Sequence, residues 1–413
     1  MFEKVIPPNI DREAFLQAMS QPPAVSIKLN RRKCNDFGLL GYGPLEPVKW
    51  CESGFYLDER PKFTLNPLLH AGVFYVQDAS SMIYETIVGQ LLTRYQMPDP
   101  LLVLDLCAAP GGKTTSMINA LPDGAFVVAN EVMRKRANIL LENLTKWGYP
   151  DVIVTNSDVR EFSRSGVRFD IVAVDAPCSG EGMMRKDSEA VAQWSPGLVA
   201  QCAALQRDIL ACAVDSLEEG GLLIYSTCTF NTSENEENLA WLIDTYGFEP
   251  VEMDFPEEWG IGRGVETSIP CWRFMPHITR GEGLFVAVLR KPGELGPGRN
   301  ISKTVEKLKK TLKVMSLPAN AQKPVKKGKS PKVEERPEVC AALSVKFEKK
   351  YPEAELSKEE ALKYLRHEAI VLHPEVPKGY VVVKFNGHAL GFVKNLGSRA
   401  NNLYPNEWRI RNL

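Results

Sequence analysis

The chain has 413 residues, of which 44% are hydrophobic and 24% charged, so we expect a folded protein of two or three domains and exclude a disordered chain. The N-terminal sequence MFEKVIPPNIDREAF has no apolar core of signal-peptide length, and no stretch approaches the roughly 20 apolar residues of a membrane span, which predicts a cytoplasmic protein. The nine cysteines are odd in number, dispersed and without a Cys-x-x-Cys pair, which argues against disulfides and against a metal site.

The first part of the chain, residues 1 to about 90, has mixed patterning. Three segments are typical of short strands, and the first of them ends in a basic cluster from Lys28 to Lys33. These segments are AVSIKLNRRK (24–33), VKWCESGFYL (48–57) and AGVFYVQ (71–77). We expect a separate α+β unit here, with its basic cluster available to phosphates.

A regular alternation begins at Leu101 and continues to about residue 290. Apolar runs of strand length alternate with helical patterns, which predicts a doubly wound parallel sheet. The expected strands are 101–106, 125–131, 151–158, 169–177 and 221–229, and the expected helices are 113–121, 134–148, 198–217 and 234–247. Ser233 and Glu236 fit a capping box at the start of the last helix, and GLFVAVLRK (283–291) is expected to close the sheet.

Composition changes abruptly after residue 292. The segment from Lys303 to Lys332 holds ten lysines and one glutamate, while residues 333–413 carry a net charge of only +2. Such a run is usually a solvated linker, and beside an active site that handles RNA it is also a candidate phosphate-contacting strap. A compact C-terminal unit follows, with one expected helix (357–368) and two expected strands (380–385 and 388–395).

Two cysteines lie at the C-terminal ends of expected strands, Cys178 in DAPCSGEG and Cys228 in YSTCT. The carboxyl ends of parallel strands line the ligand crevice of open α/β sheets, so both thiols are expected to face one site. A thiolate can attack an electron-poor ring while a second thiol assists a later step, which is the chemistry of cytosine C5 methylation. The alternative is two ordinary buried cysteines.

The first strand leads into DLCAAPGGKTT (105–115), which then begins a helix. Glycines at this turn allow close approach of a ligand, and the helix N-terminus favours a carboxylate or phosphate. A Walker A loop would need glycine at the position of Cys107, which disfavours ATP or GTP. Glu131, at the end of the second strand, can accept both ribose hydroxyls, and Asp158 is placed to meet an adenine. With no pyrophosphate fingerprint, S-adenosyl-L-methionine is favoured over NAD.

Four motifs together resemble the RNA cytosine-5 methyltransferases of the Nop2/Sun (NSUN, Fmu) family: DLCAAPGGKTT, NEVMRKRANIL, DAPCSGEGMMRKD and STCTFNTSENEENL. The resemblance covers about residues 20–290. The tail, with ALKYLRHEAI, ALGFVKN and NNLYPNEWRIRN, resembles the PUA-like region of bacterial RsmF-type 16S rRNA methyltransferases. So do HAGVFYVQDASSM and RFMPHITRGEGLFVAVL.

The resemblance implies an α/β fold, with a Rossmann-like doubly wound methyltransferase domain, an N-terminal α+β RNA-binding subdomain and a C-terminal PUA-like domain. The expected boundaries are 1–90 for the N-terminal subdomain, 91–292 for the methyltransferase domain, 293–335 for the Lys-rich linker and 336–413 for the PUA-like domain.

Carried over by residue, the resemblance makes Cys228 the nucleophile that attacks cytosine C6 and Cys178 the thiol that helps release the methylated product. Asp175 would hydrogen-bond the edge of the ring. Lys113 would tune a thiol or contact the base, or else only complete the loop, and Arg185 with Lys186 would hold phosphates or form a solvated pair. Cofactor-binding residues would be Cys107, Ala108, Ala109, Pro110, Gly111, Gly112, Lys113, Glu131, Asp158 and Asp175.

The sequence leaves the substrate open. The expected partner is ribosomal RNA, in the small subunit or its assembly intermediate, with no membrane and no obligate protein partner. Transfer RNA or large-subunit rRNA would suit the same chemistry, and fold does not choose between them. DNA is a further alternative, in which the attacking thiol would be that of the Pro-Cys motif. A non-catalytic ribosome-assembly protein is the alternative from a different class.

Overall fold

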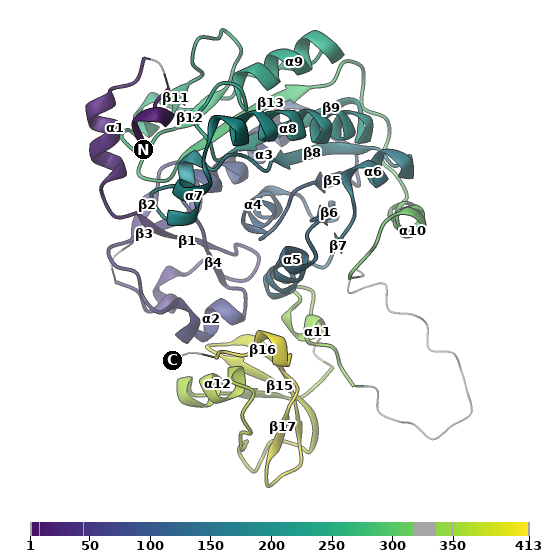
Figure 1. Ribbon diagram of the computed structural model, residues 1–413. Coiled ribbons are helices and arrows are strands. Elements are labelled where there is room, and N and C mark those ends of the chain that lie inside the picture. The colour runs from purple at the N-terminus through teal and green to yellow at the C-terminus, as the bar shows by residue number, and fades with distance from the viewer. Residues whose placement is uncertain (1, 8, 44, 317–335, 349, 412–413) are drawn as a thin grey trace.

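The computed structural model describes residues 2–7, 9–43, 45–316, 336–348 and 350–411. It contains three sheets, one in each of three units that follow one another along the chain (Figure 1). The largest sheet lies in the middle unit and has helices on both of its faces. The fold class predicted from the sequence is confirmed.

The N-terminal unit is a four-stranded antiparallel sheet in the order β2-β3-β1-β4. The central strand β1 pairs with β3 on one side and β4 on the other, so that Ile27 lies between Phe55 and Val76. Its strands are β1 (Val25–Leu29), β2 (Glu46–Val48), β3 (Cys51–Leu57) and β4 (Phe74–Val76), and its helices are α1 (Arg12–Met19) and α2 (Pro67–His70).

The central sheet combines a parallel half with an antiparallel edge. Its order is β11-β12-β13-β9-β8-β5-β6-β7, with β10 pairing to β13, and the pairs from β9 to β7 are parallel. The parallel strands are β5 (Leu102–Asp105), β6 (Phe126–Asn130), β7 (Val152–Thr155), β8 (Phe169–Asp175) and β9 (Leu217–Thr227). The antiparallel strands are β10 (Glu249–Pro250), β11 (Gly262–Arg263), β12 (Trp272–Phe274) and β13 (Leu284–Arg290).

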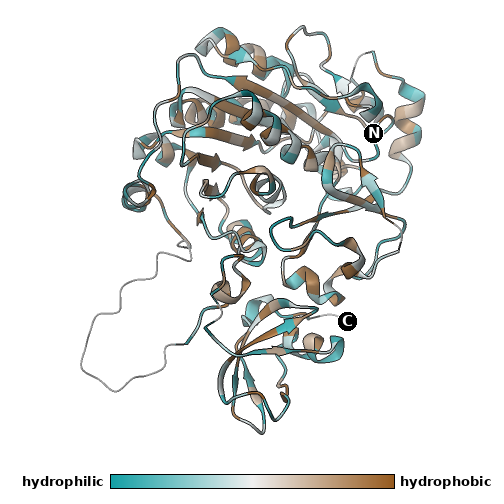
Figure 2. Cartoon of the chain, turned by 180° about the vertical axis from the view of Figure 1, so that it is seen from behind, coloured by the Kyte–Doolittle hydropathy of each residue, from teal (hydrophilic) through white to brown (hydrophobic). Residues whose placement is uncertain are grey.

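Successive residues of a strand point to opposite faces, so this sheet supplies two cores. Val103 joins the cluster beneath three helices, α3 (Ile83–Arg94), α4 (Gly112–Ala120) and α5 (Arg134–Trp147). Its neighbour Leu102 joins the opposite cluster, beneath α6 (Val159–Ser165), α8 (Pro196–Ser216) and α9 (Glu236–Tyr246). Figure 2 shows the resulting apolar centre, with brown strands inside more polar helices.

The C-terminal unit has a four-stranded sheet in the order β14-β15-β16-β17. Its apolar residues form one cluster with those of the N-terminal unit, in which Ile27 and Phe74 pack with Tyr364 and Leu390. The two units therefore dock through a shared core. The elements are α11 (Val339–Leu343), β14 (Glu353–Glu355), α12 (Lys358–Leu365), β15 (Gly379–Phe385), β16 (His388–Asn395) and β17 (Ala400–Asn402).

The expectations for the linker and for the segment before α8 need correction here. The segment predicted as a linker contains a helix, α10 (Ile301–Thr311), which buries Thr304, Val305 and Leu308. The lysines from 317 to 332 lie outside the described residues. A short helix, α7 (Ser188–Gln193), also precedes α8.

The capping box predicted for α9 does not form. The helix begins at Glu236, its N-cap is Asn235, and no side chain caps it. The Asn235 side chain instead accepts a hydrogen bond from Thr227 and donates one to the carbonyl of Thr229. Tertiary contacts at the end of β9 therefore set the start of this helix.

The expectation that no segment reaches membrane-spanning length is also wrong in one respect. Among the described residues α8 has 21 residues and is long and apolar enough to cross a membrane, by length and composition only. It buries Ile209 and Leu210 against the same cluster as β8 and β9. This packing accounts for part of its apolar character, because 28% of its most apolar window is buried.

Candidate active site

The two thiols predicted to face one site are in contact. Strands β8 and β9 are parallel neighbours that pair Asp175 with Ser226 at their C-terminal ends. The loops that follow carry Cys178 and Cys228, whose sulfur atoms are 3.1 Å apart. Both side chains are partly accessible. The parallel pairing therefore joins two motifs that are fifty residues apart in the chain.

The environment makes the two thiols unequal. The geometry allows either sulfur to donate; donation from Cys178 lowers the pKa of Cys228, and Lys113 lowers it further against the opposing effects of burial and Asp175. The same hydrogen bond, together with burial, raises the pKa of Cys178 well above its usual value. Cys228 is thus the thiol that ionises first, with Cys178 protonated beside it. Since the thiolate is the nucleophilic form, this asymmetry favours Cys228 as the attacking group.

Asp175 lies beside the thiols and is held from two sides. One carboxylate oxygen accepts a hydrogen bond from Ser226 (2.6 Å), and the other pairs with the ammonium of Lys113 (2.8 Å). Ser226 in turn accepts from the buried hydroxyl of Tyr84 (2.9 Å). Burial tends to lower the pKa of Lys113, but the Asp175 carboxylate outweighs it and the net shift is upward, so this lysine is charged.

Buried carboxylates fix the two cysteine-bearing loops to each other. Glu234 accepts from the backbone N–H of Ser179 (3.0 Å) and from Asn231 (2.7 Å), and so joins the Cys178 loop to the Cys228 loop. Glu181 accepts from the backbone N–H groups of Phe230 and Asn231. A hydrogen bond between the Ser179 and Thr229 hydroxyls closes the same junction.

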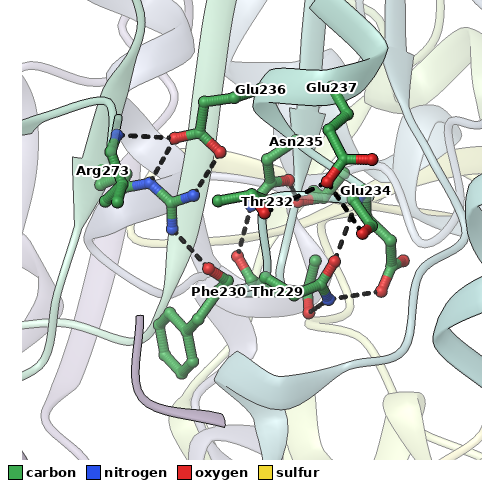
Figure 3. Close-up of polar contacts among 12 residues, drawn as sticks. Thr229, Phe230, Thr232, Glu234, Asn235, Glu236, Glu237 and Arg273 are labelled. Carbon is green, nitrogen blue, oxygen red and sulfur yellow. Dashed lines mark hydrogen bonds and ion pairs between the residues drawn. The ribbon is translucent and has the colours of Figure 1, made fainter. Parts of the chain in front are cut away.

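A buried ion pair holds the outer side of the Cys228 loop (Figure 3). Arg273 on β12 donates to both oxygens of Glu236 and, at 2.6 Å, to the carbonyl of Phe230. Both charged side chains are almost fully buried, with exposures of 2% and 6%. The loop is therefore anchored to the antiparallel edge of the sheet as well as to its neighbour.

The predicted cofactor loop lies between β5 and α4. Gly111 is the N-cap of α4, with φ of 108°, a conformation that favours glycine, and no side chain caps the helix. The first N–H groups of α4 have no partner within the helix, so they are suited to a carboxylate or phosphate of a ligand. Asp105 accepts from Thr114 at the base of the loop, and burial raises the pKa of Asp105 to about 7.

Glu131 and Asp158 lie at the ends of the next two parallel strands. Glu131 is buried, accepts from the N–H of Met133 (2.8 Å) and lies 3.3 Å from Arg136. Arg136 also donates to the carbonyl of Ala109 (2.7 Å) and so ties the acid to the loop. Asp158 is the N-cap of α6, and its hydrogen bonds from Arg160 lower its pKa to about 2. Of the two acids, Glu131 is the one linked to the loop.

Most of the basic cluster of the N-terminal unit is not available to phosphates as predicted: of its four cations only Arg31 is exposed, and it pairs with Glu52. Lys28 is fully buried against α4, and Lys33 donates to the carbonyls of Ala71 and Lys146. Arg32 donates to the carbonyls of Ile118 and Leu121 near the end of α4. These cations hold the N-terminal unit against α4 and α5.

Arg185 is likewise neither a free phosphate ligand nor a solvated cation. It is 7% exposed and pairs with buried Glu282 at 2.6 Å. It also donates to the carbonyls of Ala18 and Gly281. Lys186 remains partly exposed, 3.6 Å from both Asp78 and Glu282.

Several site residues were missed in the sequence. Ser226 and Tyr84 hold Asp175, and Glu234 and Glu181 hold the cysteine loops. Ser226 and Glu234 lie inside recognised motifs, whose spacing was a usable signal. Tyr84 lies in α3, 142 residues from its partner Ser226, and had no local signal.

In comparisons with known proteins, each of the three units matches a family model. Three family models match, described as the N-terminal domain of 16S rRNA methyltransferase RsmF (residues 3–79), 16S rRNA methyltransferase RsmB/F (96–290) and the RsmF PUA domain (351–410). The ribosomal RNA small subunit methyltransferase F of Pectobacterium atrosepticum is 35% identical over 306 residues, which are 71% of this chain and 62% of that protein. The chain thus matches less than two thirds of this relative's length.

Two solved structures share the fold. A methyltransferase homolog protein from Pyrococcus horikoshii is 26% identical, with a TM-score of 0.56 over 67% of this chain and 90% of its own. NSun6 from the same organism, solved with SFG, is 20% identical, with a TM-score of 0.57 over 68% of this chain and 94% of its own. At this lower identity the likeness shows the fold alone.

Proposed function

The chain belongs to the RsmF-type methyltransferases of the Nop2/Sun family, and on this premise we propose that it transfers a methyl group from S-adenosyl-L-methionine to C5 of cytosine in 16S ribosomal RNA. The observation that carries the proposal is the pair of thiols 3.1 Å apart, next to the Lys113–Asp175 ion pair. An ordinary pair of core cysteines would need no carboxylate and no ammonium beside it.

The residues around the cofactor loop fit S-adenosyl-L-methionine. The uncapped N-terminus of α4 suits its carboxylate, and buried Glu131 can accept the hydrogen bonds of two ribose hydroxyls. Asp158 keeps oxygen lone pairs for an adenine amine, although Arg160 already pairs with it. The bound cofactor supplies an electrophilic methyl group.

Cys228 is assigned the covalent step. Its thiolate adds to C6 of the ring, the electron pair of the C5–C6 double bond shifts toward C5, and C5 becomes nucleophilic enough to take the methyl group. The double bond is then restored when a base takes the C5 proton and Cys228 leaves C6 as a thiolate. We assign Cys178 as this base: once the Cys228 sulfur is bonded to carbon, no thiolate holds the Cys178 proton, which passes to solvent, and the Cys178 thiolate then accepts the C5 proton.

Asp175 and Lys113 are assigned to the base. The carboxylate can accept a hydrogen bond from the exocyclic amine of cytosine, and the ammonium, which stays charged, can stabilise negative charge that develops on the ring. The target base must leave its stack to bring C6 over the Cys228 sulfur, so binding involves an unstacked or flipped cytosine.

The proposed setting is the cytoplasm, with small-subunit rRNA as partner. Incubation with tritiated S-adenosyl-L-methionine and separate 16S, 23S and transfer RNAs, followed by nucleoside mass spectrometry, tests this. The proposal predicts 5-methylcytidine in 16S rRNA only. Label in transfer RNA or 23S rRNA would show that 16S rRNA is not the specific substrate. Label on an atom other than cytosine C5 would contradict the assigned reaction. Cofactor binding without methyl transfer would favour a non-catalytic RNA-binding role.

A further inference from the structure

The buried lysine beneath the cofactor loop has no role in the chemistry described above. Lys28 comes from β1 in the N-terminal unit, yet its ammonium ends at the first turn of α4 in the methyltransferase domain. It donates to the carbonyl of Gly112 (3.1 Å) and to the hydroxyls of Thr115 (2.9 Å) and Ser116 (2.6 Å). The side chain is fully buried, so it cannot contact RNA.

The hydrogen-bond partners favour the charged form of this lysine. The hydroxyls of Thr115 and Ser116 both donate to the carbonyl of Gly112, so their oxygens are free to accept. All three partners of Lys28 are thus acceptors, and only an ammonium has three N–H groups to donate. Burial works against this charge and lowers the pKa of Lys28 to about 7, while the nearby Glu85 carboxylate partly offsets burial.

A second contact from the same unit reaches the same turn. Gln77, just after β4, hydrogen-bonds to Ser116, and a Cβ atom on Gly112 would lie 3.3 Å from the Gln77 side chain. Tyr75 on β4 approaches the carbonyl of Pro110, which also accepts from Asn143. The N-terminal unit therefore contacts the cofactor loop at Pro110 and at the helical turn that follows it.

We propose that Lys28 is a positioning residue for the cofactor: it fixes the first turn of α4 and places a positive charge behind the helix end that receives the carboxylate of S-adenosyl-L-methionine. This rests on the proposed function. A positive charge near the uncapped N-terminus of α4 adds to the helix dipole and so favours an anionic group at that end. The N-terminal unit thereby contributes to cofactor affinity without touching the cofactor.

Lys28→Met tests the proposal, because methionine keeps an unbranched apolar stem and removes all three donors. Lys33→Met is the matched control, since Lys33 belongs to the same motif but donates to Ala71 and Lys146, away from the loop. Two readouts are needed: the Kd for S-adenosyl-L-methionine by calorimetry, and backbone amide exchange of residues 107–116 in the free protein.

Lys28→Met is expected to raise the Kd about ten-fold and to speed amide exchange in 107–116, with RNA affinity unchanged. Lys33→Met should stay within about two-fold of wild type in both readouts. Equal losses in both variants, or unchanged exchange and affinity in Lys28→Met, would overturn the proposal. If Lys28→Met fails to fold, Ser116→Ala is the second variant, because it removes the acceptor of the shortest hydrogen bond of Lys28. It should raise the Kd about three-fold, and an unchanged Kd in this variant would overturn the proposal.

The two readouts separate this proposal from the proposed function. A wild-type protein that binds no S-adenosyl-L-methionine would refute the function, while amide exchange in the free protein would still show whether Lys28 orders the loop.

Discussion

At the scale of single residues, the contact between Cys178 and Cys228 gives two chemically identical side chains opposite pKa shifts. The pKa of Cys178 is raised, which favours its thiol, and the pKa of Cys228 is lowered, which favours its thiolate. Lys113 adds to this asymmetry through its charge. A lone buried cysteine has a raised pKa, as Cys51 and Cys271 have here, each at about 12. The contact with Cys178 is therefore the main cause that lowers the pKa of Cys228 and favours its thiolate.

The buried ion pair behind the Cys228 loop gives a prediction on stability. Arg273→Met leaves the Glu236 carboxylate buried without its cation, which costs about 3–5 kcal/mol for pairs of this kind. Urea denaturation should show this loss. The double variant Arg273→Met/Glu236→Gln removes both charges and should recover most of it. A loss below about 1 kcal/mol in the single variant would show that the pair does not anchor the loop.

At the scale of elements, the five parallel strands, β13 and most helices of the methyltransferase domain were predictable, because strands buried on both faces appear as unbroken apolar runs. The short antiparallel strands β10, β11 and β12 were not predicted. Local patterns did not predict the outcomes that tertiary contacts decide. Ser233 has the residue type of an N-cap, but Asn235 takes that position because Thr227 and Thr229 bind its side chain.

The candidate site was likewise predictable only in part. The motifs placed Cys178 and Cys228 at strand ends, and their contact follows from parallel pairing of β8 with β9. The charge of the basic cluster predicts a phosphate ligand, because the sequence shows the charge of these side chains but not their burial. Lys28 reaches α4 across 84 residues or more of chain, and a local pattern carries no information on such a contact.

Helix α10 provides a prediction at this scale. Leu308 is fully buried in the core shared with α6 and α8, so Leu308→Ala should lower the free energy of unfolding by about 2–5 kcal/mol. Lys309→Ala, on the exposed face of the same helix, should change it by no more than about 0.5 kcal/mol. Thermal or urea denaturation measures both. Equal tolerance of the two substitutions would mean that the segment behaves as a linker after all.

At the scale of the whole molecule, the C-terminal unit is docked rather than tethered. It shares one apolar cluster with the N-terminal unit, and β16 and α12 lie beside α2 (Figure 1). The C-terminal unit also approaches the methyltransferase domain closely. A Cβ atom on Gly148, at the end of α5, would lie 2.1 Å from the carbonyl of Leu343 in α11. An RNA bound to the terminal units would therefore be held in a fixed relation to the thiols.

This docking should depend on pH through His70. The imidazole is buried in α2, bonds to the carbonyl of Thr64 and lies 3.4 Å from the hydroxyl of Tyr404. Burial, helped by Lys146, lowers the pKa of His70 to about 4. Because the unfolded chain takes up this proton near pH 6.5, stability is lost as the pH falls from 6.5 toward 4.

Unfolding free energies at pH 7 and pH 4.5 measure the effect. Wild type should lose about 2 kcal/mol more than His70→Gln over this range. An identical pH dependence in the two proteins would show that His70 is not held neutral at the junction.

The most direct test of the whole account is adduct formation by the two cysteine variants. Wild type, Cys228→Ala and Cys178→Ala are incubated with S-adenosyl-L-methionine and 16S rRNA, either free or in the small subunit, and run on denaturing gels. The account predicts that Cys228→Ala is inactive and forms no adduct, while Cys178→Ala accumulates a slowly migrating protein–RNA species. An active Cys228→Ala beside an inactive Cys178→Ala would contradict it, because the attacking thiol would then be the other one.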